Sequence, residues 1–268
     1  MDQPIQPIDS AQHRNHGFAS LSDLSFTRDQ TLCPVSGAEI TQLLPFYTLA
    51  FIKTKERFDM VALLGLNKGE NLLLSPQGKW LFAYIPARFR GYPFELAVGG
   101  SASQPKAVLC FDHRSGLYRE EPNQQAGERR FFQDDGQPTE HLQSAVNFLA
   151  SRHKVQEATR KGVTALANAG LLEHWNFGEE SEGVEVGPTG LYRVNQKALK
   201  SASPDQLHDL QAQEALALAY AQMFSMPRLG LLNRLAQLKR ESAEREAPSA
   251  DLVEELFGQQ DDTLKFNF

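Results

Sequence analysis

The sequence contains little cysteine and no long apolar run. Its 268 residues include two cysteines, Cys33 and Cys110, which are too few for a disulfide scaffold and have no zinc-type spacing. The longest apolar stretches, such as VALLGL and ALALAYA, are too short for a membrane-spanning helix. The N-terminal segment lacks the basic start and apolar run of a secretory signal peptide. We therefore expect a cytoplasmic chain with reduced thiols and no membrane insertion.

Positive charge is not concentrated anywhere in the chain. The formal net charge is −6, and residues 241–262 carry eight acidic residues and one arginine, a net charge of −7. The rest of the chain is therefore close to neutral, at +1. Nucleic-acid-binding domains concentrate Lys and Arg on one face. This distribution therefore argues against nucleic acid as the main partner.

The N-terminal half has the pattern of strands joined by tight turns. Hydrophobic residues make up 41% of the chain, which is enough for a buried core. Runs rich in aromatic and branched residues alternate with Gly, Pro, Asn and Ser. The connections are too short for crossover helices, so we expect a mainly antiparallel sheet, with curvature allowed. The predicted strands are 46–53, 58–64, 71–74, 79–85, 93–98 and 106–111.

The C-terminal half has helical spacing. Thr139 is suited to cap a helix that runs to about residue 169, where Gly170 can end it. Ser203 and Pro204 open a further helical region. This region is interrupted at Pro227 and continues as an amphipathic helix over residues 228–240. A short hairpin-like segment is expected between these helical regions, over residues 183–194.

These elements predict an α+β fold in which helices of the C-terminal half cover the sheet of the N-terminal half. The domain is expected to span residues 26–240. Residues 1–25 are polar and contain two prolines, so we expect a flexible arm there. Residues 241–268 are expected to form an acidic tail.

The segment from Arg88 to Phe94 is the strongest candidate for a binding site. In an extended segment, Arg88 and Arg90 project to the same side and present two guanidinium groups to a carboxylate or phosphate. Tyr92 and Phe94 can flank an apolar side chain. The alternative is a structural turn, anchored by the aromatic rings, in which the arginines pair with acids of the same chain.

Two pairs of polar residues are weaker candidates for catalysis or metal binding. Asp112 and His113 are adjacent, and a carboxylate beside an imidazole can perform acid–base chemistry. His153 and Glu157 are four residues apart on a predicted helix and can share one metal ion, although no second ligand pair accompanies them. A polar strand end and a solvated helix face explain the two pairs as well. We expect no metal and no cofactor.

The last residues of the chain suggest a docking strand. Leu264, Phe266 and Phe268 alternate with polar residues after an acidic spacer, which is typical of a strand added to a sheet edge of this chain or of a partner. The alternative is a frayed terminus. Pairing of such strands between two copies would allow a homo-oligomer.

Four segments together resemble the SapC family, bacterial proteins named for an association with surface-layer protein genes. The resemblance covers roughly residues 15–240. It implies a role linked to the cell surface and a gene context that includes TonB-dependent receptors. It carries no established catalytic residues. The segments are VALLGLNKGENLLLSPQGKWLFAYIPARFRGYPFEL, LCFDHRSGLY, GLYRVNQKALKSASPDQLHDL and ALALAYAQMFSM.

From these features we expect a non-enzymatic binding or accessory protein for a peptide, a protein or a partner enzyme linked to cell-surface or TonB-type uptake systems. One alternative is a peptide- or protein-tailoring enzyme of the oxygenase or hydroxylase type, or a subunit of one. A second alternative is a surface-layer component. Metal analysis and absorbance spectra of the purified protein would identify the first alternative, and cell fractionation the second.

Overall fold

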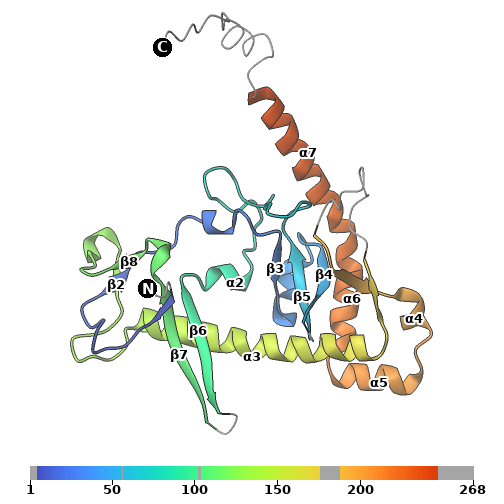
Figure 1. Cartoon of the computed structure of the whole chain (residues 1–268), viewed down its shortest axis with the longest axis horizontal. Coiled ribbons are helices and arrows are strands. Elements are labelled where there is room, and N and C mark those ends of the chain that lie inside the picture. The colour runs from blue at the N-terminus through green and yellow to red at the C-terminus, as the bar shows by residue number, and fades with distance from the viewer. Residues whose placement is uncertain (1–4, 56, 102–103, 176–187, 247–268) are drawn as a thin grey trace, which may run out of the picture.

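The computed structural model describes residues 5–55, 57–101, 104–175 and 188–246. Three small antiparallel sheets lie along one long helix, and further helices pack at the C-terminal end of that helix (Figure 1). The predicted α+β class with antiparallel strands is confirmed. The strands are divided among three sheets rather than joined in one. None of the helices within the described ranges is long and apolar enough to cross a membrane.

The central sheet holds most of the hydrophobic core. Its strand order is β10-β11-β4-β5-β3. Met60, Val61, Ala62 and Leu63 of β5 are all buried, because helices pack against the sheet. This explains why the segment reads as a continuous apolar run. The bounds are β3 Leu32–Pro34, β4 Leu49–Thr54, β5 Arg57–Leu63, β10 Leu172–His174 and β11 Leu191–Val194.

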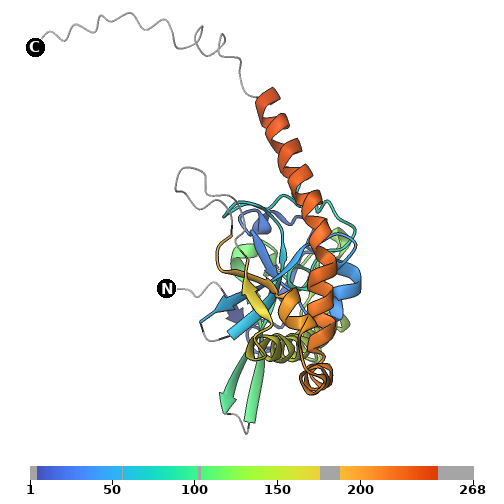
Figure 2. The same cartoon turned by 90° about the vertical axis from the view of Figure 1, so that its right-hand side faces the viewer.

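The second sheet is dominated by a long two-stranded ribbon that extends away from the body (Figures 1 and 2). Its order is β1-β7-β6, with β1 at Ile5–Pro7, β6 at Phe94–Ser101 and β7 at Gln104–Asp112. The third sheet has the order β8-β2-β9. Its strands are β2 Gly17–Phe18, β8 Tyr118–Arg119 and β9 Arg129–Arg130.

The helix α3, Glu140–Asn168, connects the two hydrophobic clusters. Val163 and Leu166 belong to the main core, and Leu142 belongs to a second cluster with Phe18, Phe111, Phe131 and Phe132. The other helices are α1 Ile40–Leu43, α2 Ala87–Arg90, α4 Gln196–Lys200, α5 Pro204–Ala212, α6 Ala215–Ser225 and α7 Leu229–Glu246. Short 3-10 turns occupy Ser25–Thr27, Gly37–Glu39, His113–Ser115, Gln124–Ala126 and Met226–Arg228.

The predicted ends of α3 and the predicted start of α5 are confirmed by their caps, whereas α7 continues to Glu246, beyond the predicted end at residue 240 and into the segment expected to be an acidic tail. The hydroxyl of Thr139 accepts a hydrogen bond from the Leu142 amide, and Gly170 adopts a left-handed φ of 69° just after α3. Ser203 caps α5 in a capping box, with Pro204 in its first turn. The predicted interruption at Pro227 falls in the 3-10 turn between α6 and α7.

Two predicted strands are wrong. Residues 71–74 and 79–85 form a loop with one isolated bridge, between Leu74 and Trp80. The side-chain oxygen of Asn71 accepts a hydrogen bond from the Leu73 amide, so this N–H is not available for pairing with a neighbouring strand. Leu72, Leu73 and Leu74 are nevertheless buried. Their apolar character reflects packing into the core and not strand pairing.

The prediction of a flexible arm is wrong for residues 5–25, and residues 1–4 lie outside the described chain. The strand β1 pairs with β7, and β2 pairs on both sides, with β8 and β9. Phe18 and Leu24 are buried. A few apolar anchors among polar residues are therefore enough to fix this segment to the sheets.

Two other predictions fall partly or wholly on residues that the structure does not describe. The strand-like motif with Leu264, Phe266 and Phe268 lies outside the described residues. Residues 183–187 of the hairpin-like segment also lie outside them. The rest of that segment contains β11, which pairs with β10 and β4.

Candidate functional site

The segment from Arg88 to Phe94 forms a corner between α2 and β6. The helix α2 is one turn long and begins after Pro86. Phe89 is buried, and the ring of Tyr92 stacks on Phe26 with 3.9 Å between centroids. The expectation that Arg88 and Arg90 project to the same side is wrong, because residues two apart on a helix point in nearly opposite directions.

Glu39 fixes this corner in place. Its buried carboxylate accepts hydrogen bonds from the Ser36 amide and hydroxyl at 3.0 Å each, from the Tyr84 hydroxyl at 3.0 Å and from the Ala87 amide at 2.7 Å. The last bond holds the first turn of α2. Burial, with the Glu39 charge as the next cause, raises the pKa of Tyr84 to about 12. The phenol therefore stays protonated at neutral pH and donates to Glu39.

Arg90 is anchored to aromatic rings. Its guanidinium donates to the Tyr84 hydroxyl at 3.1 Å and lies 5.2 Å from the centroid of that ring and 5.4 Å from that of Phe148. It lines a cavity of about 340 Å³ on the α3 side of the corner, together with Arg129 and His141. Arg90 is thus held within the chain, as a structural turn requires, but by a hydroxyl and aromatic rings and not by the acids that this interpretation expected.

Arg88 has a different environment, which it shares with Arg152 of α3. Arg88 and Arg152 both line a cavity of about 460 Å³ and an adjoining one of about 390 Å³. Burial, and next the charge of Arg88, lowers the pKa of the half-buried Arg152. Among the described residues, no carboxylate forms an ion pair with either guanidinium. We call these two residues the arginine pair.

The larger cavity combines this positive charge with an aromatic wall. Tyr92 and Phe94 of the predicted site line it, together with Phe26. Its acids are Asp112 and Glu95. Asp112 is already bound by Arg114, through bonds of 3.2 and 3.3 Å. Glu95 is exposed and lines both cavities. It is therefore the acid best placed to balance the arginine pair.

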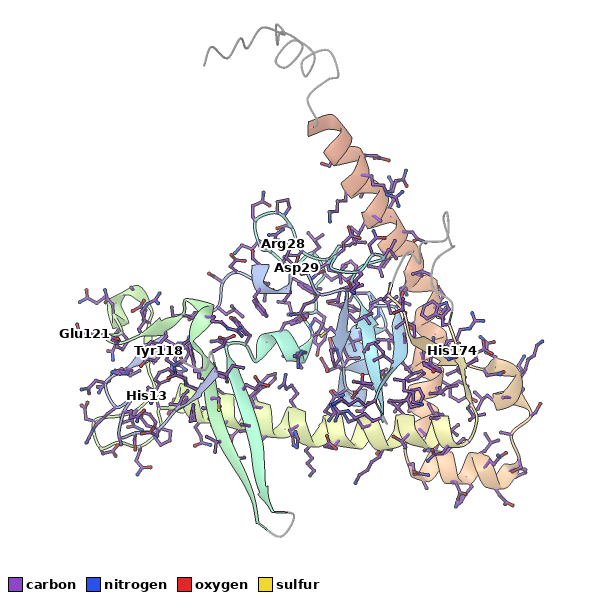
Figure 3. All side chains as sticks on the ribbon, in the orientation of Figure 1. His13, Arg28, Asp29, Tyr118, Glu121 and His174 are labelled. Carbon is purple, nitrogen blue, oxygen red and sulfur yellow. The ribbon has the colours of Figure 1, made fainter. Side chains whose placement is uncertain are left out.

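The predicted acid–base pair is divided between two environments. Asp112 is held by Arg114, and His113 turns toward aromatic rings, 4.2 Å from the centroid of Tyr118 and 5.9 Å from that of Phe111. Burial, with His13 next, lowers the pKa of His113. His13 and Tyr118 lie near each other at this end of the molecule (Figure 3). The ring of His113 is therefore part of an aromatic cluster.

The predicted metal-binding pair, His153 and Glu157, does not form a common ligand set. Glu157 accepts a hydrogen bond from Arg160, which also donates to Asp59 at 2.6 Å. His153 is exposed and lines the smaller cavity next to Arg152. Within the described ranges, no group of three or more His, Cys, Asp or Glu could hold a metal ion. The four acid–base and metal candidates do not share one cavity.

Two important residues were missed by sequence reasoning. Glu39 had a local signal, because Ser36 and Glu39 have the spacing of a capping box. Arg152 had no such local signal. It lies on a helix in the sequence pattern, and that pattern does not indicate which distant residue shares its surroundings.

Comparison with known proteins identifies the family. No curated protein and no solved structure matches the chain. A family model described as SapC matches residues 8–232, which include the corner and the arginine pair. The chain therefore belongs to the SapC family.

Proposed function

We propose that this chain is a binding or accessory protein that captures an acidic segment of a peptide or partner protein at the arginine pair. One observation carries the proposal: Arg88 and Arg152 line shared cavities, and no described carboxylate pairs with either of them. Two neighbouring positive charges, one of them half-buried, oppose each other until an anion arrives. Guanidinium groups bind carboxylates through two parallel hydrogen bonds.

The chemistry of the cavity favours a peptide carboxylate over a phosphate. Glu95 lies on the same lining, whereas the charge of Asp112 is balanced by Arg114; Glu95 would repel a doubly charged phosphate more strongly than a single carboxylate. Phe26, Tyr92 and Phe94 supply an apolar surface for a neighbouring side chain. An acidic residue next to an apolar one matches both parts. Within this proposal, the partner belongs to cell-surface or TonB-type uptake systems, and the chain meets it in the cytoplasm.

Replacing Arg88 with alanine should weaken capture of acidic peptides. Random short peptides are displayed and selected on the immobilised full chain, and the retained peptides should be rich in Asp and Glu. Their affinity for Arg88→Ala should fall by about tenfold or more, since a hydrogen bond to a charged group contributes roughly 1.5–3 kcal/mol. Fluorescence anisotropy with the labelled peptides measures the loss.

Arg90→Ala is the matched control. Arg90 lies on the same helical turn as Arg88, but it lines the separate cavity of about 340 Å³ and neither of the two cavities of the arginine pair. Its effect on affinity should be less than about threefold. Retained peptides without acidic enrichment, or equal affinity for Arg88→Ala and the unmodified chain, would contradict the proposal.

Replacing Glu95 with glutamine should have the opposite effect and strengthen binding of the same peptides. The substitution removes the exposed carboxylate that lines both cavities and that competes with a ligand carboxylate for the arginine pair. We expect a gain of about threefold at low salt, which shrinks as salt screens the exposed charge. The same anisotropy titration measures it. Glu121→Gln, at another exposed acid outside both cavities, controls for net charge. An equal gain in both variants would contradict a local role for Glu95.

A further inference from the structure

We infer that the acidic segment binds as an added β-strand along the free edge of β6. The inference rests on the proposed function and adds the main-chain geometry of the complex. In the sheet order β1-β7-β6, β6 pairs on one side with β7 and is the last strand on its other side. Figure 1 shows this side of β6 turned toward the central sheet.

The hydrogen-bond register identifies which groups face outward. The Asp112 amide donates to the Pro93 carbonyl at 2.9 Å, so residues of β7 with the parity of Asp112 bond to β6. The Ile8 amide donates to the Leu109 carbonyl at 2.9 Å, so the alternate residues of β7 bond toward β1. In an antiparallel ladder these roles alternate. Leu96, which lies opposite Leu109, therefore directs its N–H and C=O away from β7.

The space beyond this edge is the cavity of about 390 Å³, the smaller of the two that the arginine pair lines. Leu96 and Glu95 of β6 line it, and so do both members of the arginine pair. An added strand at Leu96 would therefore run past Arg88 and Arg152. Side chains on alternate positions of that strand point the same way, so one set can present its carboxylates to the guanidinium groups.

The opposite wall of the cavity, at the edge strand β3, is poorly suited to form main-chain hydrogen bonds with an added strand. Pro34, at the end of the edge strand β3, lines it and has no N–H. The Val35 carbonyl already accepts a bond from the Gln156 side chain at 3.4 Å. In contrast, the sequence of β6, FELAVGGS, contains neither proline nor a basic residue. The edge of β6 is thus the one that can supply main-chain bonds.

These observations specify the partner by its chemistry. It is an extended segment with acidic residues on one set of alternate positions and with free backbone N–H groups. Main-chain bonds to β6 would supply affinity, and the arginine pair would select for the carboxylates.

The test uses the acidic peptide that the full chain retains most strongly, synthesised in two N-methylated forms. One form is methylated at odd positions and the other at even positions. In an added strand, one set of N–H groups faces β6 and the other faces solvent. One form should therefore lose about tenfold or more in affinity, while the other form binds nearly as the parent peptide does.

The protein side is tested with Leu96→Pro and Leu96→Ala. Proline removes the outward N–H and leaves the bonds to β7 intact, whereas alanine keeps the N–H and removes only the side chain. Leu96→Pro should bind about fivefold or more weakly than Leu96→Ala. Hydrogen exchange of the Leu96 amide should slow when the peptide binds the unmodified chain. If Leu96→Pro does not fold, the methylated peptides and the exchange rate decide.

The outcomes separate the two proposals. Equal binding of both methylated forms, with unchanged exchange at Leu96, overturns strand addition and leaves capture by the arginine pair standing. A selection without acidic enrichment removes the proposed function and this inference together. Light scattering tests whether a second copy of the chain occupies this edge. A dimer that forms without peptide and that Leu96→Pro converts to a monomer would overturn the inference.

Discussion

Replacing Glu39 with alanine should lower the free energy of unfolding by about 4 kcal/mol, because it leaves several buried hydrogen-bond donors without an acceptor. The carboxylate receives bonds from Ser36, Tyr84 and Ala87, all at the junction of the central sheet and the corner. Denaturant unfolding followed by circular dichroism measures the change. Acidic peptides should also bind more weakly, since the Ala87 bond sets the direction of α2 and of Arg88.

Two further variants make this result specific. Glu39→Gln keeps one acceptor oxygen, so its loss of stability should be roughly half that of the alanine variant. Glu70→Ala removes another acid, one that pairs with the exposed Lys239 at 2.9 Å, and should cost less than about 1 kcal/mol. Similar losses for Glu39→Ala and Glu70→Ala would show that the buried network does not anchor the corner.

Replacing Gly17 with alanine should lower the free energy of unfolding by about 2–4 kcal/mol, since the added methyl group has no space. The strand β2 lies between β8 and β9, and a Cβ on Gly17 would be 2.0 Å from the Arg129 carbonyl oxygen. That atom belongs to the backbone, so the clash can be relieved only by moving β9 away from β2. Denaturant unfolding measures the loss, and amide exchange should rise in the third sheet.

Gly230→Ala is the matched control. Gly230 lies in α7, and a Cβ there meets no atom within 4 Å. Alanine is a better helix former than glycine, so this variant should be stabilised by up to about 1 kcal/mol. A Gly17→Ala protein as stable as the unmodified chain would contradict the tight pairing of β2.

Local chemistry in the sequence predicted the helices well. Thr139, Gly170, Ser203 and Pro204 act through caps and turns within a few residues, so their roles can be read without the tertiary structure. The strands were harder to predict. Leu72–Leu74 have the composition of a strand but pack as a buried loop, because burial and not pairing selects their apolar side chains.

The candidate site was predictable only in part. The segment from Arg88 to Phe94 was recognised, and Arg88, Tyr92 and Phe94 do line one cavity. Arg90 lines a different cavity because the backbone forms a helical turn there. The neighbour of Arg88 in the cavities is Arg152 of α3, which lies 64 residues later in the sequence (152 − 88 = 64) and belongs to no motif that includes Arg88. Such a pair arises from tertiary packing, which periodicity and spacing do not encode.

The length of α3 has a consequence for how the molecule responds to its ligand. Its 29 residues reach from the second hydrophobic cluster at Leu142 to the main core at Leu166, and Arg152 lies between the two. Neither cluster can come apart without freeing one end of this shared helix. Loss of order at one end therefore weakens the other, which favours cooperative, all-or-none unfolding. A ligand held at Arg152 would act on both ends at once and raise the resistance of the whole molecule to unfolding.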